Sequence, residues 1–290
     1  MFQKNIPATS VVYMISVVIL THNEVINIER CLASVSWTDD IVVIDSGSTD
    51  GTVELAEKLG ARLLFRPFDN FANQRNFALD TGQLKYKWVL HLDADEEVTP
   101  ELATEMQLIA SDEDGMPGYL VPSRLILLGQ WLKRSGMYPS YQVRFGSRDE
   151  LRFRMVGHGQ RELLESAQIG TLTSDLIHYN FSKGISEWLT KHARYARDEA
   201  YLAVNSNDKF HWGDLLQSRN KLKRRRSLKQ MGQSMPLRSV LRFSYVYFVR
   251  LGILDGRAGL RYALLMAVYQ WMIDLNIIEI QQQNLDSQVE

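Results

Sequence analysis

The chain has 290 residues, of which 45% are hydrophobic and 23% charged, and it contains one cysteine, Cys31. This composition is typical of a folded soluble protein and excludes disordered, collagen-like and coiled-coil chains, while one cysteine excludes an internal disulfide framework. The net charge of −1 conceals a division, because residues 1–180 carry −8, residues 181–290 carry +7, and residues 219–261 hold 12 basic residues against one acid.

Short apolar runs alternate with helical patterns through the first half of the chain. The pattern predicts strands over 15–20, 40–45, 62–65 and 87–92, and helices over 24–35, 52–59, 70–80 and 100–109. Strands rich in Val, Ile and Leu that alternate with helices are typical of α/β proteins. We therefore expect a Rossmann-like, mostly parallel sheet with helices on both of its faces.

The later part of the chain changes character. Residues 118–179 are more strand-like, with many arginine and aromatic residues, and residues from 182 onward follow a helical pattern. A signal peptide over 11–20 is disfavoured because no cleavage site follows it. After residue 20 we expect no apolar run long enough to span a bilayer; the longest, 262–273, suits a core helix or an interfacial helix.

Polar residues follow three of the predicted strands. They form the segments Thr21–Glu24, Asp45–Thr52 and Asp93–Glu97. Ligands of parallel α/β sheets bind outside the carboxyl ends of the strands. We therefore expect the functional site to be built from these three segments.

The sharpest local pattern is Asp93-Ala94-Asp95. Two carboxylates one residue apart on a turn can converge on Mg²⁺ or Mn²⁺, which often bridges a protein carboxylate to substrate phosphates. The ordinary alternative is a solvated acidic turn.

A second pattern is Asp45 followed by a loop rich in Ser, Gly and Thr. Its carboxylate can accept hydrogen bonds from a base or a ribose hydroxyl, and the small residues let a ligand approach the backbone. The alternative is a plain turn with Asp50 or Thr52 as the cap of the next helix. The glycine patterns of dinucleotide-binding and P-loop proteins are absent from this loop.

Three motifs in this order, Ile-Leu-Thr-His-Asn-Glu, Val-Val-Ile-Asp-Ser-Gly-Ser-Thr-Asp-Gly-Thr and Leu-Asp-Ala-Asp-Glu, resemble inverting glycosyltransferases of family 2, which have the GT-A fold. The resemblance covers about residues 14–180. Segments around residues 73–79, 138–145 and 157–162 are similar to the bacterial branch that builds lipopolysaccharide core and surface polysaccharides. The resemblance implies a nucleotide-sugar donor, a glycan acceptor, and residues 1–13 as an extension outside the catalytic domain.

The resemblance also assigns roles to residues on the donor side. It implies that Asp45 holds the base, that Asp93 faces the ribose or the sugar, and that Asp95, together with Asp93, forms the metal site. The other implied donor-binding residues are Thr21, His22 and Glu24 at the first strand end and Gln74, Arg75 and Asn76 in the segment that closes over the nucleotide.

The remaining implied residues lie on the acceptor side. A general base must remove the proton of the acceptor hydroxyl; the resemblance favours Glu162, with His158 second. The alternatives are a salt bridge of Glu162 with Arg152 or Arg161, and a packed histidine. The predicted acceptor-binding residues are Trp131, Tyr138, Gln142 and Arg144, although core packing is the alternative for the aromatic side chains.

The basic rear of the chain is open to several interpretations. The run over 219–230 can bind nucleic acid or membrane lipid, or form a solvated face. Residues 237–280 interleave arginine with aromatic residues, which favours a helix at an anionic membrane surface and disfavours a nucleic-acid partner. We therefore predict a GT-A domain over 14–181, with its nucleotide-sugar half ending near 117. Residues 182–290 are predicted as a helical region that attaches peripherally, through 219–280, to the cytoplasmic face of the inner membrane.

Two competing functions remain at this point. A nucleotidyltransferase also uses an Asp-x-Asp pair and a nucleotide, but it releases pyrophosphate instead of a nucleoside diphosphate. A nucleic-acid-binding protein that uses 219–230 would show strong, salt-dependent affinity for polynucleotides, yet it leaves the three strand-end segments unexplained.

Overall fold

The computed structural model describes residues 14–112, 114–156, 159–205 and 237–289. The predicted extension 1–13, the basic run 219–230 and His158 lie outside the described residues. The chain divides into two compact units: the sheet unit comprises residues up to 122, 141–154 and 161–177, and the C-terminal unit comprises 123–140, 155–160 and the residues from 178 onward.

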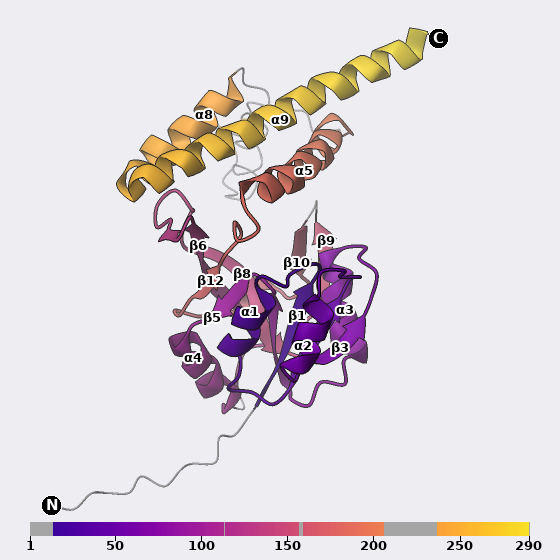
Figure 1. Cartoon of the computed structure of the whole chain (residues 1–290), viewed down its shortest axis with the longest axis vertical. Helices are drawn as coiled ribbons and strands as arrows, with labels where there is room; N and C mark the ends of the chain where they lie inside the picture. The colour runs from indigo at the N-terminus through magenta and orange to yellow at the C-terminus, as the bar shows by residue number, and fades with distance from the viewer. Residues whose placement is uncertain (1–13, 113, 157–158, 206–236, 290) are drawn as a thin grey trace, which may run out of the picture. The chain divides into compact units, whose positions relative to one another are not determined.

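The sheet unit is built on four parallel strands in the order β3-β2-β1-β4. Figure 1 labels β1 and β3 of this part of the sheet. Their bounds are Ile15–Thr21 for β1, Ile41–Asp45 for β2, Arg62–Phe65 for β3 and Trp88–Asp93 for β4. The buried positions are almost all Val, Ile or Leu, as expected for parallel strands covered on both faces. The predicted strands are confirmed to within one residue at each end.

Beyond β4 the sheet becomes mixed, because β8 (Ser140–Ser147) pairs with β4 in the antiparallel direction. The order continues β8-β6-β12-β5, and β7 and β11 both pair with β6. These strands are β5 (Glu96–Val98), β6 (Gly118–Leu127), β7 (Gln130–Trp131), β11 (Ile169–Thr171) and β12 (Leu176–His178), while β9 (Phe153–Val156) and β10 (Gly159–Glu162) form a separate ribbon. The α/β class is therefore confirmed, with its parallel part in the first half.

Helices cover both faces of the sheet. They are α1 (Ile28–Ser34), α2 (Thr52–Lys58), α3 (Phe71–Thr81) and α4 (Pro100–Ala110). Alternate residues of β1 enter different cores, since Val17 packs with residues of α1 and α4, whereas Val18 packs with residues of α3. This alternation fixes the register of β1 and with it the position of the strand ends.

Two details of the helices differ from the sequence predictions. The first helix begins at Ile28 and not at Glu24, because the N–H groups of Asn27 and Ile28 both donate to the Glu24 carbonyl in a turn. The second helix is preceded by Gly51 in the left-handed conformation and has no side-chain cap. The predicted cap Asp50 instead accepts from the backbone N–H groups of Thr52 and Val25, each at 3.1 Å.

The C-terminal unit contains the helices of the rear of the chain. They are α5 (Ile185–Asn205), α8 (Arg238–Ser244), the π-helical turn η2 (Tyr245–Val249), the 3₁₀ turn η3 (Gly252–Asp255) and α9 (Gly256–Val289). Trp188 of α5 and Ala258 of α9 share a buried cluster with Leu127 and Leu132. The helical pattern predicted from residue 182 onward is confirmed over Ile185–Asn205.

The expectation that no segment is long enough to span a bilayer needs revision. Among the described residues, one stretch, Gly252–Leu285, is long and apolar enough to do so by length and composition. Only 17% of its most apolar window is buried, so it is not the enclosed core helix of a globular domain. Length and composition alone do not distinguish a spanning helix from one that lies in a membrane interface.

A buried carboxylate joins the two parts of the C-terminal unit. The Asp255 side chain, at the end of η3, accepts from the backbone N–H groups of Arg134 at 3.0 Å and Ser135 at 2.8 Å, and from the Ser135 hydroxyl at 2.7 Å. Gly252 permits this approach, since a Cβ there would lie 2.6 Å from the Val246 carbonyl oxygen and 3.1 Å from the Ser135 Cβ. The loop after β7 is thus fixed to the start of α9.

Candidate active site

Three of the predicted site residues stand side by side at the carboxyl ends of adjacent strands. Thr21 of β1 is in register with Asp45 of β2, and Leu20 of β1 is in register with Asp93 of β4. The Thr21 hydroxyl is buried and has no hydrogen-bond partner within the part of the chain that the structure describes. A buried hydroxyl without a partner costs free energy, so this strand end provides a group that a ligand can satisfy.

The Asp45 carboxylate organises the loop that follows β2. It is buried and accepts from the N–H groups of Gly47 at 2.7 Å and Ser48 at 2.9 Å, and from the Ser48 hydroxyl. Gly47 has φ of 95°, which favours glycine at this position. These three hydrogen bonds leave acceptor capacity on the carboxylate, so a base or a ribose could still donate to it. That contact stays a prediction.

Asp93 lies between two buried arginines. Arg75 of α3 donates to one carboxylate oxygen at 2.7 Å, and Arg144 of β8 donates to the other at 2.7 Å. Arg144 also pairs with the buried Glu96 at 2.7 Å, and Glu96 accepts from the Asp93 backbone N–H at 2.9 Å. We call these four residues, Arg75, Asp93, Glu96 and Arg144, the arginine–carboxylate network.

The charges of the network have opposite effects on the two arginines. Burial and the charge of Arg144 lower the pKa of Arg75 to about 10, despite the attraction of Asp93 and Glu96. Burial also acts to lower the pKa of Arg144, but Asp93 and Glu96 raise it above the ordinary arginine value. Burial and both arginines lower the pKa of His91, in the middle of β4, well below its ordinary value. At neutral pH both arginines are therefore charged and His91 is neutral.

The network changes the interpretation of two predicted residues. Both oxygens of Asp93, predicted as a metal ligand, already accept from arginines, and Arg144, predicted to bind the acceptor, is buried beside Asp93. Sequence reasoning missed Glu96 as a member of the site. Its only signal was its position in Asp-Ala-Asp-Glu, which does not distinguish a buried carboxylate from a solvated one.

Asp95 is the other residue predicted to hold a metal ion. It is half-buried just after β4, whereas Asp93 is held by arginines. Among the residues that the structure describes, no group of three or more His, Cys, Asp or Glu side chains could hold a metal ion. Mg²⁺ is often held by one or two carboxylates together with substrate phosphates, so the side chains present fit a metal that binds together with a diphosphate.

Gln74 and Asn76 of α3, on either side of Arg75, make different contacts. Gln74 is buried, and its amide nitrogen donates to the Ser46 hydroxyl at 3.1 Å in the loop after β2. Its amide oxygen has no partner among the described residues. Asn76 instead exchanges two hydrogen bonds with the backbone of Phe153, at 2.9 and 3.0 Å. Gln74 thus lies beside the Asp45 loop. The side-chain amide of Asn76 is already hydrogen-bonded to the backbone of Phe153, and the predicted contact of Asn76 with the nucleotide-sugar donor stays a prediction.

The other predicted residues of the first strand end are less buried. His22 is exposed. Glu24 is half-buried and accepts from the side chain of Asn27 at 2.7 Å. The backbone N–H of Glu24 donates to the Thr52 hydroxyl at 2.8 Å, which connects the β1 and β2 loops.

The candidate base Glu162 lies at the end of β10 and is half-buried. Within the described ranges it makes no ion pair with Arg152 or Arg161, the alternative considered from sequence. Arg152 pairs with Asp80 at 3.3 Å instead.

The predicted acceptor residues fall into two places. Gln142 is exposed on β8 of the sheet unit. Trp131 and Tyr138 belong to the C-terminal unit, where their rings meet edge to face with centroids 5.1 Å apart. Both side chains are half-buried. Their burial therefore does not distinguish packing in the core from stacking on a sugar ring.

The family of the chain follows from comparison with known proteins. The profile of the family "Glycosyl transferase family 2" matches residues 16–160, half of the chain, including the ends of β1, β2 and β4. The chain therefore belongs to this family. Family membership and the parallel strand order together identify its fold as GT-A.

Individual relatives agree with this assignment. An uncharacterized glycosyltransferase of Rickettsia conorii is 43% identical over 96 residues, 33% of each chain, so this chain spans about a third of the length of that relative. The lipopolysaccharide core biosynthesis glycosyltransferase LpsC of Rhizobium meliloti is 25% identical over 198 residues, 66% of this chain and 72% of LpsC. Among solved structures, glucosyl-3-phosphoglycerate synthase from Mycobacterium tuberculosis, in complex with Mn²⁺, uridine diphosphate and glucosyl-3-phosphoglycerate, has a TM-score of 0.45 at 20% identity, covering 68% of this chain and 84% of that one.

Proposed function

We propose that the protein transfers a sugar from a nucleoside-diphosphate sugar of the uridine type to a hydroxyl of a lipid-linked or lipopolysaccharide glycan. The observation that carries the proposal is the register of Thr21, Asp45 and Asp93 at adjacent strand ends, with Asp95 directly after them. The similarity to LpsC, whose name places it in lipopolysaccharide core biosynthesis, supports the acceptor class.

On the donor side, the Asp45 loop and Gln74 receive the nucleoside, and the unpartnered Thr21 hydroxyl lies between the Asp45 and Asp93 strand ends. Arg75 and Arg144 fix both oxygens of Asp93, so this carboxylate faces the ribose or sugar in one orientation. Asp95 holds the metal. A bound Mg²⁺ or Mn²⁺ supplies charge stabilisation to the departing diphosphate.

On the acceptor side, a base removes the proton of the attacking hydroxyl. We assign this role to Glu162, with His158 as the second candidate. Glu162 is half-buried and makes no ion pair within the described ranges, so its carboxylate is available to accept a proton. Direct displacement by the acceptor inverts the configuration of the anomeric carbon.

The nature of the released product tests the reaction class. We expect the purified protein, supplied with Mg²⁺ or Mn²⁺ and a panel of nucleotide sugars, to release nucleoside diphosphate from one of them. Chromatography of the nucleotide products gives the readout. Release of pyrophosphate instead would identify a nucleotidyltransferase and contradict the proposal.

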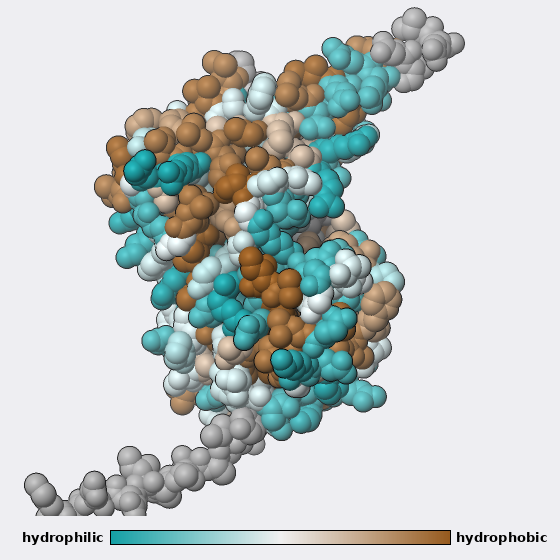
Figure 2. Space-filling model, in the orientation of Figure 1, coloured by the Kyte–Doolittle hydropathy of each residue, from teal (hydrophilic) through white to brown (hydrophobic). Residues whose placement is uncertain are grey.

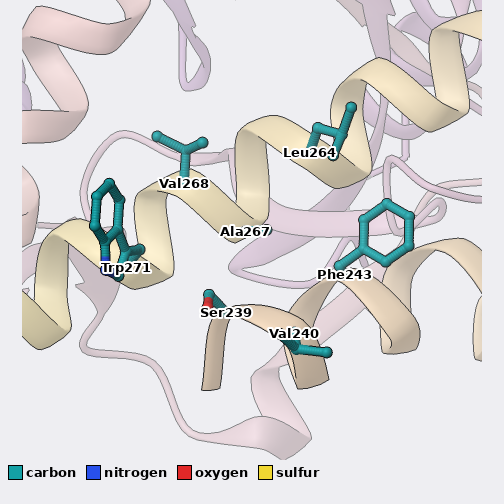
Figure 3. A pocket seen from close by; sticks show the side chains of 7 residues that line it. All are labelled: Ser239, Val240, Phe243, Leu264, Ala267, Val268 and Trp271. Carbon is teal, nitrogen blue, oxygen red and sulfur yellow. The ribbon is translucent and has the colours of Figure 1, made fainter. Parts of the chain in front are cut away.

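We further propose that α8 and α9 attach the enzyme peripherally to the cytoplasmic face of the inner membrane. Figure 2 shows apolar side chains gathered over these two helices. An open groove of about 340 Å³ lies between them (Figure 3), and its lining residues are Ser239, Val240, Phe243, Leu264, Ala267, Val268 and Trp271. Arg257 and Arg261 are exposed on α9 just before this apolar stretch, which suits an anionic membrane surface.

Replacing Val268 and Trp271 together by glutamate should reduce binding to vesicles that contain phosphatidylglycerol by at least about tenfold, because two large exposed apolar side chains are lost from the surface. Co-sedimentation with the vesicles measures the effect. The matched control is Leu108→Glu on α4, which is also exposed, at 67%, and should bind as the unaltered protein does.

Extraction of cell membranes with alkaline carbonate distinguishes an α9 that lies in the membrane interface from an α9 that crosses the bilayer. Release of the protein is the expected result for an interfacial helix. Retention in the membrane pellet would show that α9 crosses the bilayer, and an equal loss of vesicle binding in the control would mean that the α8–α9 surface is not specific.

A further inference from the structure

The turn between α8 and α9 presents a concentration of large apolar side chains. The chain reverses here through η2 and η3, at one end of the helix pair (Figure 1). Along α9, exposed side chains of this kind recur only every three or four residues, as at Leu264, Val268 and Trp271. In the turn, by contrast, six of the ten residues 245–254 are large, apolar and exposed. They are Tyr245, Phe248, Val249, Leu251, Ile253 and Leu254. We call residues 245–254 the apolar tip.

Arginines flank the apolar tip. Residues 237–261 contain five arginines and one acid, Asp255. Asp255 is buried and hydrogen-bonded to the loop after β7, and Arg238 is already paired with a carboxylate of α9. Arg257 and Arg261, in the first turns of α9, are exposed and make no ion pair within the part of the chain that the structure describes. An apolar end with unpaired positive charge beside it is the combination that an anionic membrane interface attracts.

The backbone of the apolar tip is suited to an apolar environment. The N–H groups of Arg250, Leu251 and Leu254 donate to carbonyls within the tip, at 2.8, 3.2 and 2.9 Å. Backbone groups that are bonded in this way need no water, so they can leave it without being stranded. Val246 is fully buried beneath the tip, and the Asp255 hydrogen bonds fix its far end. Because the tip is already ordered, binding costs little further conformational entropy.

We infer that the apolar tip enters the acyl boundary of an anionic membrane first, and that Arg257 and Arg261 bind lipid phosphates beside it. The inference rests on the proposed peripheral attachment, and it adds which segment lies deepest and which lipid group is recognised. Guanidinium groups form charge-assisted, often bidentate hydrogen bonds with phosphates. At a rise of 1.5 Å per residue, Val268 lies about 18 Å along α9 from Gly256. The groove between α8 and α9 then lies nearer to the headgroups than the tip does.

An environment-sensitive fluorophore on single introduced cysteines measures the depth of each segment. The labelling sites are Val249→Cys in the tip, Val268→Cys on α9 and, as the control, Leu108→Cys on α4; all three positions are exposed, and the native Cys31 is buried. In vesicles of phosphatidylglycerol we expect the emission of the Val249→Cys probe to shift to shorter wavelength. Nitroxides deep in the acyl chains should quench it most strongly, and shallow nitroxides should quench the Val268→Cys probe. The control should not respond.

The alternatives predict different results in the same experiment. A Val268→Cys probe as deep as the Val249→Cys probe would show that α9 lies flat, and would overturn the inference while the attachment stands. An apolar environment of the Val249→Cys probe without vesicles, in a protein that is dimeric in solution, would assign the tip to a second copy of the chain and also overturn the inference. If the unaltered protein does not co-sediment with the vesicles, the proposed attachment itself fails.

Paired charge variants test the role of the arginines. Arg257→Gln combined with Arg261→Gln should weaken binding to phosphatidylglycerol vesicles about tenfold, because each arginine near an anionic leaflet adds to the attraction. The matched control is Arg194→Gln combined with Arg197→Gln on α5, which removes the same charge from exposed positions and should bind as the unaltered protein does. Equal losses in the two double variants would show that net charge alone matters, and would overturn the assignment of the lipid phosphate to Arg257 and Arg261.

Discussion

Asp95→Asn should lower the rate of sugar transfer by about a thousandfold while the protein remains folded. The substitution keeps the size of the side chain but removes the charge that would hold the divalent cation against the diphosphate, and a metal supplies several kcal/mol of transition-state stabilisation. Since Asp93 and Glu96 are the carboxylates paired at 2.7 Å with the buried arginines, we expect a smaller change in thermal unfolding from Asp95→Asn than from the loss of a network residue. Turnover at saturating Mn²⁺ measures the effect.

The neighbouring carboxylate provides the control for this experiment. Glu97 is half-buried two residues further along and lies 3.8 Å from Arg30. Glu97→Gln should retain nearly full activity and the same response to Mn²⁺. Full activity of Asp95→Asn, or equal losses in both variants, would mean that Asp95 does not hold the metal.

Arg144→Met should destabilise the protein by about 3–5 kcal/mol, because it leaves the buried carboxylate of Glu96 and one oxygen of Asp93 without their cation. Urea unfolding measures the free energy. Transfer activity should fall as well, since Asp93 loses one of the two bonds that orient it. Arg144→Lys should recover part of the stability but not the orientation, because one ammonium does not reproduce the planar guanidinium fork.

A double variant distinguishes the loss of the ion pair between Arg144 and Glu96 from a general effect of the substitutions on packing. Glu96→Gln removes the negative charge that Arg144 balances, so the combination with Arg144→Met should be less destabilised than the sum of the two single changes. A coupling free energy of about 1 kcal/mol or more is expected for groups in direct contact. Strict additivity would show that Arg144 and Glu96 do not stabilise each other.

The strand ends were predictable from sequence because their signals are local. Asp45 and Asp93 are the last residues of mostly apolar strands of five and six residues, and β-strand geometry then places both at one edge of a parallel sheet. The same reasoning located the helices, apart from the turn at Glu24–Asn27, where a carbonyl that accepts two N–H groups delays the start of α1.

The arginine–carboxylate network was not predictable in the same way. Arg144 is 51 residues from Asp93 and 48 from Glu96, and it reaches both because β8 returns antiparallel to β4. No periodicity in the sequence records that pairing. An arginine in a polar segment is indistinguishable, by composition alone, from one that faces a substrate, so Arg144 was assigned to the acceptor.

The grouping of residues 123–140 with the C-terminal helices was equally hidden. It depends on Asp255, whose carboxylate accepts hydrogen bonds from residues 120 positions earlier in the chain. The sequence does show glycines at 252, 256 and 259, but that Gly252 and Gly259 are points of close backbone approach requires the structure.

The Asp255 contact has a consequence for how this enzyme can change over time. The hairpin with Trp131 and the apolar helices are held by the same carboxylate, so neither can be exchanged for a counterpart from another protein without stranding two backbone N–H groups. Recombination that replaces one must carry the other with it. The β6–β7 hairpin and the apolar helices are therefore inherited as a single module.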